Sequence, residues 1–265
     1  MDEAIGLFRA RKLAEATTAF EKLAVAEPTN PEPAFYLGQI ALHREDPETA
    51  VRWLEKTVDL APRKSAYQKT LGDAYCLSTA KASLFSKGGF AKKALATLKK
   101  AVALDPDNLE ARESLIQFYR RAPAIAGGGM DKAYAEAAEI QKRNEVRGAL
   151  VLVELYAAEK KYPEAFALLD AAIAKKPESK ILLYQLGRIA ENSGQQLDRG
   201  EAALKAYLQS PPQPGEPAPC NAHWRLGTLY EKKGDQAAAR HEYETALQLN
   251  PGFRQAQEAL KKLNP

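Results

Sequence analysis

The chain has 265 residues, of which 45% are hydrophobic and 27% are charged. This balance provides enough apolar material for an extended core and excludes an intrinsically disordered chain. The 38 basic and 34 acidic residues give a net charge of +4, a near balance that does not favour nucleic-acid binding.

Signals for membrane spans, export and metal binding are missing from the sequence. No run reaches the roughly 18 apolar residues of a membrane span, so we expect no membrane insertion. Met1-Asp2-Glu3-Ala4 lacks the basic start of a secretory signal, so we expect a cytoplasmic protein, or a periplasmic one if a signal before Met1 was removed. Cys76 and Cys220 lie far apart and form no C-x-x-C motif, which predicts neither a disulfide framework nor a thiolate metal site.

A pattern of small and large apolar residues recurs along almost the whole chain, with a period in the range of helical repeats. In chain order its copies are Leu7, Ala16, Phe20, Leu23 and Pro28; Leu37-Gly38, Ala41, Ala50, Leu54 and Pro62; Leu71-Gly72, Tyr75, Ala94, Leu98, Ala101 and Pro106; Leu115, Tyr119, Ala133, Ala137 and Ile140; Leu152, Tyr156, Ala165, Leu169, Ala172 and Pro177; Leu186-Gly187, Ala190, Leu204, Tyr207 and Pro212; and Leu226-Gly227, Tyr230, Ala239, Tyr243, Ala246 and Pro251.

These copies resemble the L-G-x2-Y, A-x3-F and P signature of the tetratricopeptide repeat family. The resemblance implies an all-α, right-handed superhelical solenoid of about seven helix-turn-helix units in a single domain, 1–265. The expected units are 1–30, 31–64, 65–108, 109–145, 146–179, 180–219 and 220–253, with a capping helix at 254–265. In each unit two antiparallel helices meet at small residues, and the prolines end the second helices. Because Met1 enters the pattern four residues late, we expect a short or irregular first helix.

Two copies carry extra residues between their helices. Ten extra residues in 76–93 include Gly88-Gly89, and five extra residues in 120–132 include Gly127-Gly128-Gly129. We expect loop extensions at the same corner of adjacent units, and the alternative is a shared recognition flap or a small-molecule site. The segment from Tyr119 to Ala133 resembles an A-P-x-x-x-G-G-x-x-x-K-A loop of some bacterial proteins of the family, which favours a bacterial source.

No catalytic constellation is complete. Ser78-Thr-Ala-Lys81 matches S-x-x-K but lacks the companion motifs of that chemistry. The glycine runs fit neither phosphate-binding signature, and we expect them in helix-to-helix turns. The histidines His43, His223 and His241 have no metal-ligand spacing. The sequence therefore predicts no enzyme, no metal and no cofactor. The proline-rich stretch 210–219 is expected to be a semi-rigid connector, with an adaptor ligand as the alternative.

The resemblance also implies which side chains face a concave groove, because in this family the first helix of each pair lines it. Carried over, the groove positions are Phe35, Gln39, His43, Lys69, Asp73, Glu113, Gln117, Arg120, Arg121, Arg147, Glu154, Tyr184, Arg188, Asn192, Asn221, Trp224 and Thr228. Partly exposed aromatic anchors are expected at Phe35, Tyr184 and Trp224, with packing between repeats as the alternative. The carboxylate clamp of the chaperone-binding subclass is not reproduced, because Phe35, Gln39, Lys69 and Asp73 occupy its positions.

The sequence therefore predicts a non-catalytic scaffold that binds a protein or peptide partner in this groove. A different class of function, self-assembly into a homo-oligomer through the solenoid ends, remains the alternative. Arginines at the groove positions, including Arg147 and Arg188, either pair carboxylates of a partner or belong to a solvated charged surface.

Overall fold

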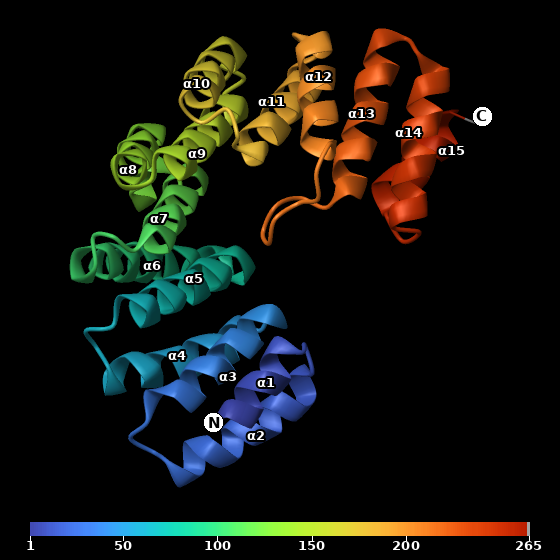
Figure 1. Cartoon of the computed structure of the whole chain (residues 1–265). Helices are drawn as coiled ribbons and strands as arrows, with labels where there is room; N and C mark the ends of the chain where they lie inside the picture. Colours follow the sequence, from blue (N-terminus) through green and yellow to red (C-terminus); the bar gives the residue numbers. More distant parts are fainter. Residues whose placement is uncertain (264–265) are drawn as a thin grey trace. The chain divides into compact units, whose positions relative to one another are not determined.

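A computed structural model describes residues 1–263, apart from the side chain of Leu84. The described residues form fifteen α-helices and one 3₁₀-helix, with no strand among them (Figure 1). The helices are α1 (Asp2–Arg9), α2 (Leu13–Ala26), α3 (Pro31–His43), α4 (Pro47–Leu60), α5 (Ser65–Lys81), α6 (Leu84–Leu104), α7 (Leu109–Arg121), η1 (Ala124–Ala126), α8 (Met130–Arg143), α9 (Glu145–Ala158), α10 (Tyr162–Lys175), α11 (Lys180–Ser193), α12 (Leu197–Leu208), α13 (Pro219–Lys233), α14 (Gln236–Leu249) and α15 (Arg254–Leu263).

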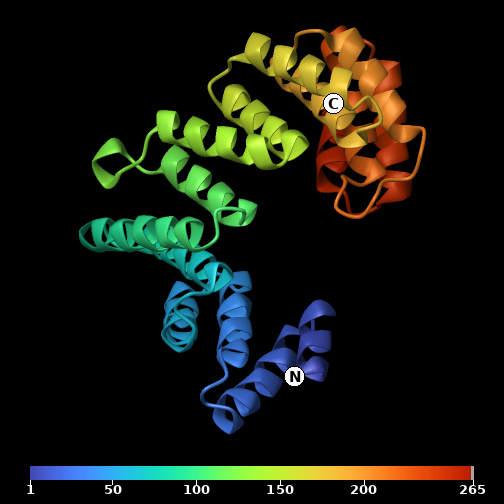
Figure 2. The same ribbon diagram turned by 60° about the vertical axis from the view of Figure 1, so that its left-hand side comes forward.

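The chain divides into two compact units, Met1–Arg143 and the residues from Asn144 onward. Within each unit, successive helices pack as hairpins, such as α5 with α6 and α13 with α14, and the second helix of a hairpin packs on the next first helix. Figure 2 shows the paired helices side by side. The first helices of neighbouring hairpins also touch, α3 with α5 and α5 with α7 in the first unit, α9 with α11 and α11 with α13 in the second. The all-α repeat fold expected from the sequence is therefore confirmed.

Small residues allow the two helices of a hairpin to approach closely. The six alanines that occupy this position in the repeat are all completely buried: Ala16, Ala50, Ala94, Ala133, Ala165 and Ala239. The glycines act in the same way, since a Cβ on Gly72 would lie 2.5 Å from Leu98 Cδ2 and one on Gly187 would lie 2.3 Å from Leu204 Cγ. No larger side chain fits at these positions without separating the helices.

The turns between hairpins combine a proline with a fixed pattern of polar contacts. Pro62, Pro106 and Pro251 each follow a second helix, and the side chain six residues later donates a hydrogen bond to the proline carbonyl. The donors are Gln68, Arg112 and Gln257, at distances of 2.9, 2.9 and 2.7 Å. Because proline cannot continue the helix and its carbonyl is satisfied from the next helix, the turn has a defined geometry.

Asparagine and aspartate start several of the helices. Asn30, Asn108 and Asn144 cap α3, α7 and α9, and Asp46 and Asp235 cap α4 and α14, each accepting a hydrogen bond from a backbone N–H of the first turn. Side chains of this type satisfy donors that the helix itself leaves unpaired.

The prediction of a loop extension at 76–93 is wrong, because the extra residues lengthen both helices of the hairpin. Helix α5 has 17 residues and α6 has 21, with only Ala82 and Ser83 between them. Gly88 and Gly89 accordingly lie inside α6 and not in a turn. Alanine and lysine make up 10 of the 21 residues of α6, and their high helix propensity outweighs the two glycines once α6 packs on α5.

The second insertion is a loop, as expected. It contains η1 and the positive-φ residues Gly127 and Gly129, and η1 contacts α6. A Cβ on Gly128 would lie 1.8 Å from the carbonyl oxygen of Ala122, so the tight turn requires glycine there.

The two terminal helices are short. Helix α1 has only 8 residues, in agreement with the late entry of the pattern. At the other end α15 packs on α14, with Ala256 buried and Leu260 and Leu263 packed against the same cluster. The last two residues of the expected cap, 264–265, lie outside the described residues, and the division into seven units of one domain stays a prediction.

Two glycine substitutions in the α5–α6 hairpin should have opposite effects. Gly72→Ala places a methyl group against Leu98 and should lower the free energy of unfolding by about 1–3 kcal/mol. In Gly88→Ala the added methyl group has no atom within 4 Å on an exposed helical surface. This substitution should raise the free energy of unfolding by about 0.5–1 kcal/mol. Urea unfolding followed by circular dichroism measures both, and equal effects of the two would contradict the close approach at Gly72.

Candidate functional site: the face of the first helices

In the first unit the predicted groove positions lie on α3, α5 and α7. Phe35 is half-buried, with its ring 4.7 Å from that of Tyr67, so it packs between neighbouring hairpins. Lys69 Nζ lies 2.7 Å from Asp73 Oδ2, so the two side chains form an ion pair along α5. Most of this face is therefore polar, with half-buried Gln39 and Arg120 and exposed His43, Gln117 and Arg121.

In the second unit an ion pair joins a predicted position on α11 to one on α9. Arg188 on α11 forms an ion pair with Glu154 on α9, and its Nε donates a hydrogen bond to Gln185 at 2.5 Å. The guanidinium that was expected to bind a partner is therefore already held by two groups of the chain. Arg147 on α9 is half-buried and also interacts within the chain.

Arg225 is the residue that organises this face, and the sequence did not single it out. Its Nε donates to the hydroxyl of Tyr184 at 2.8 Å, and its Nη1 pairs with Glu191. The side chains of Arg225 and Glu191 are only 15% and 10% exposed. The guanidinium also lies 5.0 Å from the centre of the Trp224 ring. Arg225 adjoins a predicted position instead of occupying one, and no pattern in the sequence marks it.

The three aromatic anchors differ in exposure. Tyr184 is only 5% exposed and its ring lies 5.2 Å from that of Tyr207, so the expectation of a partly exposed ring is wrong for Tyr184. Its ring packs inside the α11–α12 hairpin, and its hydroxyl accepts a hydrogen bond from Arg225 of the next hairpin. Trp224 is half-buried, with its ring edge-to-face to Phe253 at 6.1 Å. On the same helix Asn221 and Thr228 are half-buried, and Asn192 near the end of α11 is exposed.

A second polar cluster joins α12 to α13, away from the predicted positions. Glu201 accepts hydrogen bonds from Lys205 and Lys233, both at 2.7 Å. It also accepts one from the hydroxyl of Tyr230 at 2.8 Å. Burial alone would raise the pKa of Glu201, but these three donors outweigh it and lower the pKa to about 2.

The fragments of catalytic motifs do not assemble. Ser78 Oγ is buried and donates to the carbonyl of Ala74 at 2.9 Å, while Lys81 pairs with Glu45, so the S-x-x-K residues have separate structural partners. Burial, together with the Asp73 carboxylate, raises the pKa of the Cys76 thiol to about 12, which keeps it protonated at neutral pH. His223 Nδ1 lies 2.7 Å from Glu242. Residues 1–263 contain no group of three or more His, Cys, Asp or Glu side chains placed to hold a metal ion.

The proline-rich stretch 210–219 is tied back onto α11 and α12. Lys180 donates hydrogen bonds to the carbonyls of Ser210 and Pro211 at 2.6 and 2.8 Å, and the hydroxyl of Tyr207 donates to that of Pro217. These contacts fit the connector expected from the sequence.

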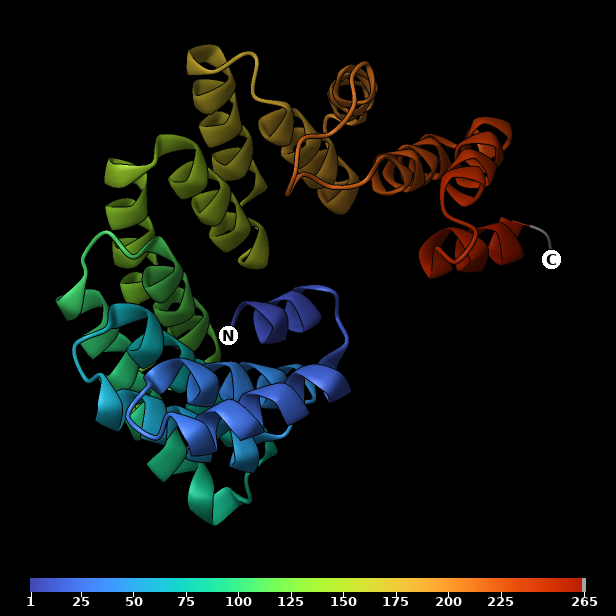
Figure 3. The same cartoon turned by 60° about the horizontal axis from the view of Figure 1, so that its bottom comes forward.

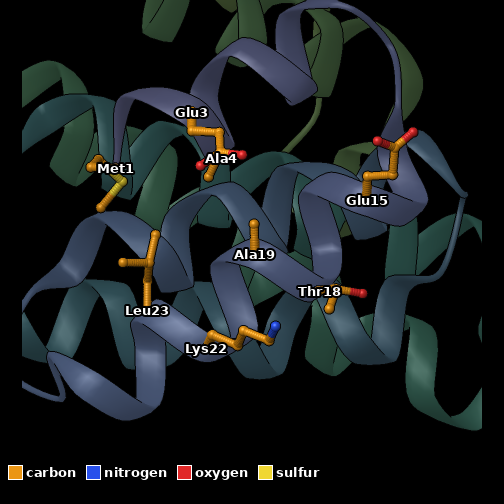
Figure 4. A pocket seen from close by; sticks show the side chains of 8 residues that line it. All are labelled: Met1, Glu3, Ala4, Glu15, Thr18, Ala19, Lys22 and Leu23. Atoms are coloured by element: carbon orange, nitrogen blue, oxygen red, sulfur yellow. The ribbon is translucent and has the colours of Figure 1, made fainter.

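The outer side of the first hairpin carries a hollow of about 560 Å³ (Figure 4). Its lining combines apolar and charged side chains from α1 and α2: Met1, Glu3, Ala4, Glu15, Thr18, Ala19, Lys22 and Leu23. The mixed lining gives no preference for a particular occupant, and self-association through the chain ends stays a prediction. Among the described helices, none is both long and apolar enough to cross a membrane.

Removing Arg225 should destabilise the second unit strongly. Arg225→Ala leaves the buried Glu191 carboxylate without its ion-pair partner, at a cost of about 3–5 kcal/mol in the free energy of unfolding. The matched control is Arg199→Ala, which breaks the half-exposed pair of Arg199 with Asp170 and should cost no more than about 1 kcal/mol. Chemical unfolding of both variants measures the difference, and similar losses would show that the Arg225 pair is not a buried one.

Glu201 should make stability depend on acid pH. Because its pKa in the folded chain is about 2, against 4.5 for a free glutamate, ionised Glu201 stabilises the fold at every pH above about 4.5. This contribution is lost as pH falls from 4.5 toward 2. We expect the difference in unfolding free energy between the wild type and Glu201→Gln to shrink over that range. A constant difference from pH 7 to pH 2.5 would contradict the depressed pKa.

Comparison with known proteins places the chain in a family. Two models described as tetratricopeptide repeat match it, one over residues 1–65 and 150–217 and the other over residues 220–253. No curated protein matches the chain significantly.

Solved structures of low sequence identity share the fold. A tetratricopeptide repeat protein from Parabacteroides merdae superposes with a TM-score of 0.66 at 17% identity. The superposition covers 100% of this chain and 97% of the Parabacteroides chain. PilF of Pseudomonas aeruginosa gives 0.53 at 15% identity, covering 88% of this chain and 97% of its own. Yeast Tom70 gives 0.70 at 15% identity, covering 96% of this chain and 51% of its own. With the repeat models matching half of the sequence and this fold throughout, the chain belongs to the tetratricopeptide repeat family.

Proposed function

We propose that this protein is a scaffold that binds an extended or helical segment of a partner protein on the face formed by α9, α11 and α13. Tetratricopeptide repeat proteins are generally non-catalytic protein–protein interaction scaffolds, and proteins of this family bind protein partners. The observation that carries the proposal is the contact of three successive first helices, whose partly exposed side chains are already held in place by internal ion pairs.

Preorganisation is what makes this face suited to binding. Arg188 is fixed by Glu154, and the Trp224 ring is held between Arg225 and Phe253. Side chains that are ordered before binding lose little conformational entropy when a ligand arrives. The face therefore offers a rigid aromatic anchor to an apolar side chain of the partner.

Polar side chains on α11 and α13 are available for the hydrogen bonds that an extended chain needs. The amides of Asn192 and Asn221 each donate and accept, which matches the alternating donors and acceptors of a peptide backbone. Thr228 lies one turn beyond Trp224 on α13. The buried Tyr184 contributes indirectly, because its hydroxyl accepts a hydrogen bond from Arg225 and so orients that side chain.

The first unit offers a separate and more polar surface of the same kind. Its proposed contact residues are Phe35, Gln39, Lys69, Asp73, Gln117, Arg120 and Arg121. With mixed charges and no fully exposed aromatic ring among them, these positions suit a polar segment of a partner better than an apolar one.

A peptide selection tests the proposal on the second unit. Peptides of about 12 residues displayed on phage are selected against the whole chain, and the synthetic winners are titrated into Trp53→Phe, in which all tryptophan fluorescence comes from Trp224. We expect Trp224 emission to change on binding and Asn192→Ala/Asn221→Ala to weaken binding about tenfold, the loss of two modest hydrogen bonds.

The matched control is Gln248→Ala/Gln255→Ala, which removes two exposed amides from α14 and α15. Its affinity should equal that of the parent chain. Peptides that bind all three proteins equally and leave Trp224 emission unchanged would place recognition elsewhere and contradict the proposal.

A further inference from the structure

Helix α6 belongs to a stretch of unusual charge. Between Asp73 and Asp105 the chain has no acidic residue, and its basic residues are all lysines: Lys81, Lys87, Lys92, Lys93, Lys99 and Lys100. The whole chain is nearly balanced, so this one-sign segment is a local feature. Five of the lysines belong to α6 itself.

Most lysines of α6 lie on the side of the helix away from the core; Lys87 is exposed but falls on the same helical face as Ala91. Ala91, Ala94, Leu98 and Ala101 are buried at the spacing of one helical face, and Lys92, Lys99 and Lys100 fall on the opposite face and are exposed. Lys93 is also exposed, but it lies 3.6 Å from Glu55 of α4, which neutralises part of its charge. From Lys92 to Lys100 the outer face extends about 12 Å along the helix axis, so Lys92, Lys99 and Lys100 form one positive patch.

Two large apolar side chains protrude from α6 and from the neighbouring η1. Phe85 in the first turn of α6 is 100% exposed, and Ile125 in η1 is 99% exposed. Helix η1 contacts α6, and Gly127 directly after η1 faces Leu95, ten residues along α6 from Phe85. Figure 3 shows the teal α5–α6 hairpin projecting at the bottom of the view. Neither Phe85 nor Ile125 packs in the core, and neither belongs to the repeat pattern.

We propose that the lysine face of α6, with Phe85 and Ile125, adsorbs to a bilayer of anionic phospholipids. Lysines near an anionic membrane surface are attracted to it without a fixed geometry, and exposed aromatic and aliphatic side chains enter the boundary between headgroups and acyl chains. A protein partner fits less well, because lysine is depleted in protein interfaces and single projecting side chains form no complementary patch. This peripheral adsorption requires no helix that spans the membrane, and it leaves the face of α9, α11 and α13 free to bind its partner.

Vesicle sedimentation with the whole chain tests the proposal. The probes are vesicles of phosphatidylcholine alone and vesicles containing about a third phosphatidylglycerol, at low and at high salt. We expect binding only to the anionic vesicles and a steep loss at high salt, because screening weakens the attraction of exposed charges. Equal binding to both vesicles, or no binding to anionic vesicles at low salt, would overturn the proposal.

Matched charge variants then locate the surface. Lys92→Gln/Lys99→Gln/Lys100→Gln should weaken binding to anionic vesicles about tenfold or more. Lys232→Gln/Lys261→Gln/Lys262→Gln removes the same charge from exposed positions of the second unit and should change it by no more than about twofold. Equal losses in the two variants would mean that net charge alone drives binding and would overturn the assignment to α6.

The apolar part has its own variant, Phe85→Ser/Ile125→Ser, in which both substituted side chains are fully exposed in the parent chain, so the fold should be unaffected. We expect weaker binding that keeps its salt dependence, since the lysines remain. Unchanged affinity would remove Phe85 and Ile125 from the proposed surface. Circular dichroism and thermal unfolding of all variants show that the loss comes from the surface and not from unfolding.

Discussion

The fold depends on the close approach of the two helices of a hairpin at a residue with a small side chain or none. In four of the hairpins a glycine of the first helix faces a leucine or tyrosine of the second, as Gly227 faces Tyr243 and Gly38 faces Leu54. Because one hairpin buries only part of its apolar surface, the next hairpin must pack against it, and stacking then propagates along each compact unit. The turns, caps and proline contacts only have to keep successive hairpins in register.

The same stacking produces the surface on which function is proposed. First helices that touch each other bring their side chains together, so that Arg188 pairs with Glu154 and Arg225 pairs with Glu191. Most of the charges on that surface neutralise each other, so the face is rigid and nearly balanced. Recognition there relies on Trp224 and on amide groups more than on a strong electrostatic field.

Helix α6 shows how a repeat protein acquires a surface that its repeat does not require. Lengthening α5 and α6 keeps the buried alanine and leucine positions of the repeat and adds several residues that are exposed, Phe85 and Lys87 among them. Phe85 and the lysines of the outer face are therefore free of the constraint that shapes the rest of the chain. Their composition reflects another requirement, which we assign to a membrane surface.

The sequence by itself determined the fold, because the spacing of small residues, large apolar residues and prolines has a direct physical meaning in a helical hairpin. The buried alanines, the helix ends before prolines and the short α1 all followed from it. The insertion at 76–93 did not, since helix propensity and packing on α5 decided between loop and helix.

The candidate site was only partly predictable. Repeat position placed Trp224 and Arg188 on the right helices, but the burial of Tyr184 and the role of Arg225 depend on contacts between hairpins. Tertiary structure alone decided those, because it brings α11 and α13 together and places Glu191 where only a neighbouring guanidinium satisfies it.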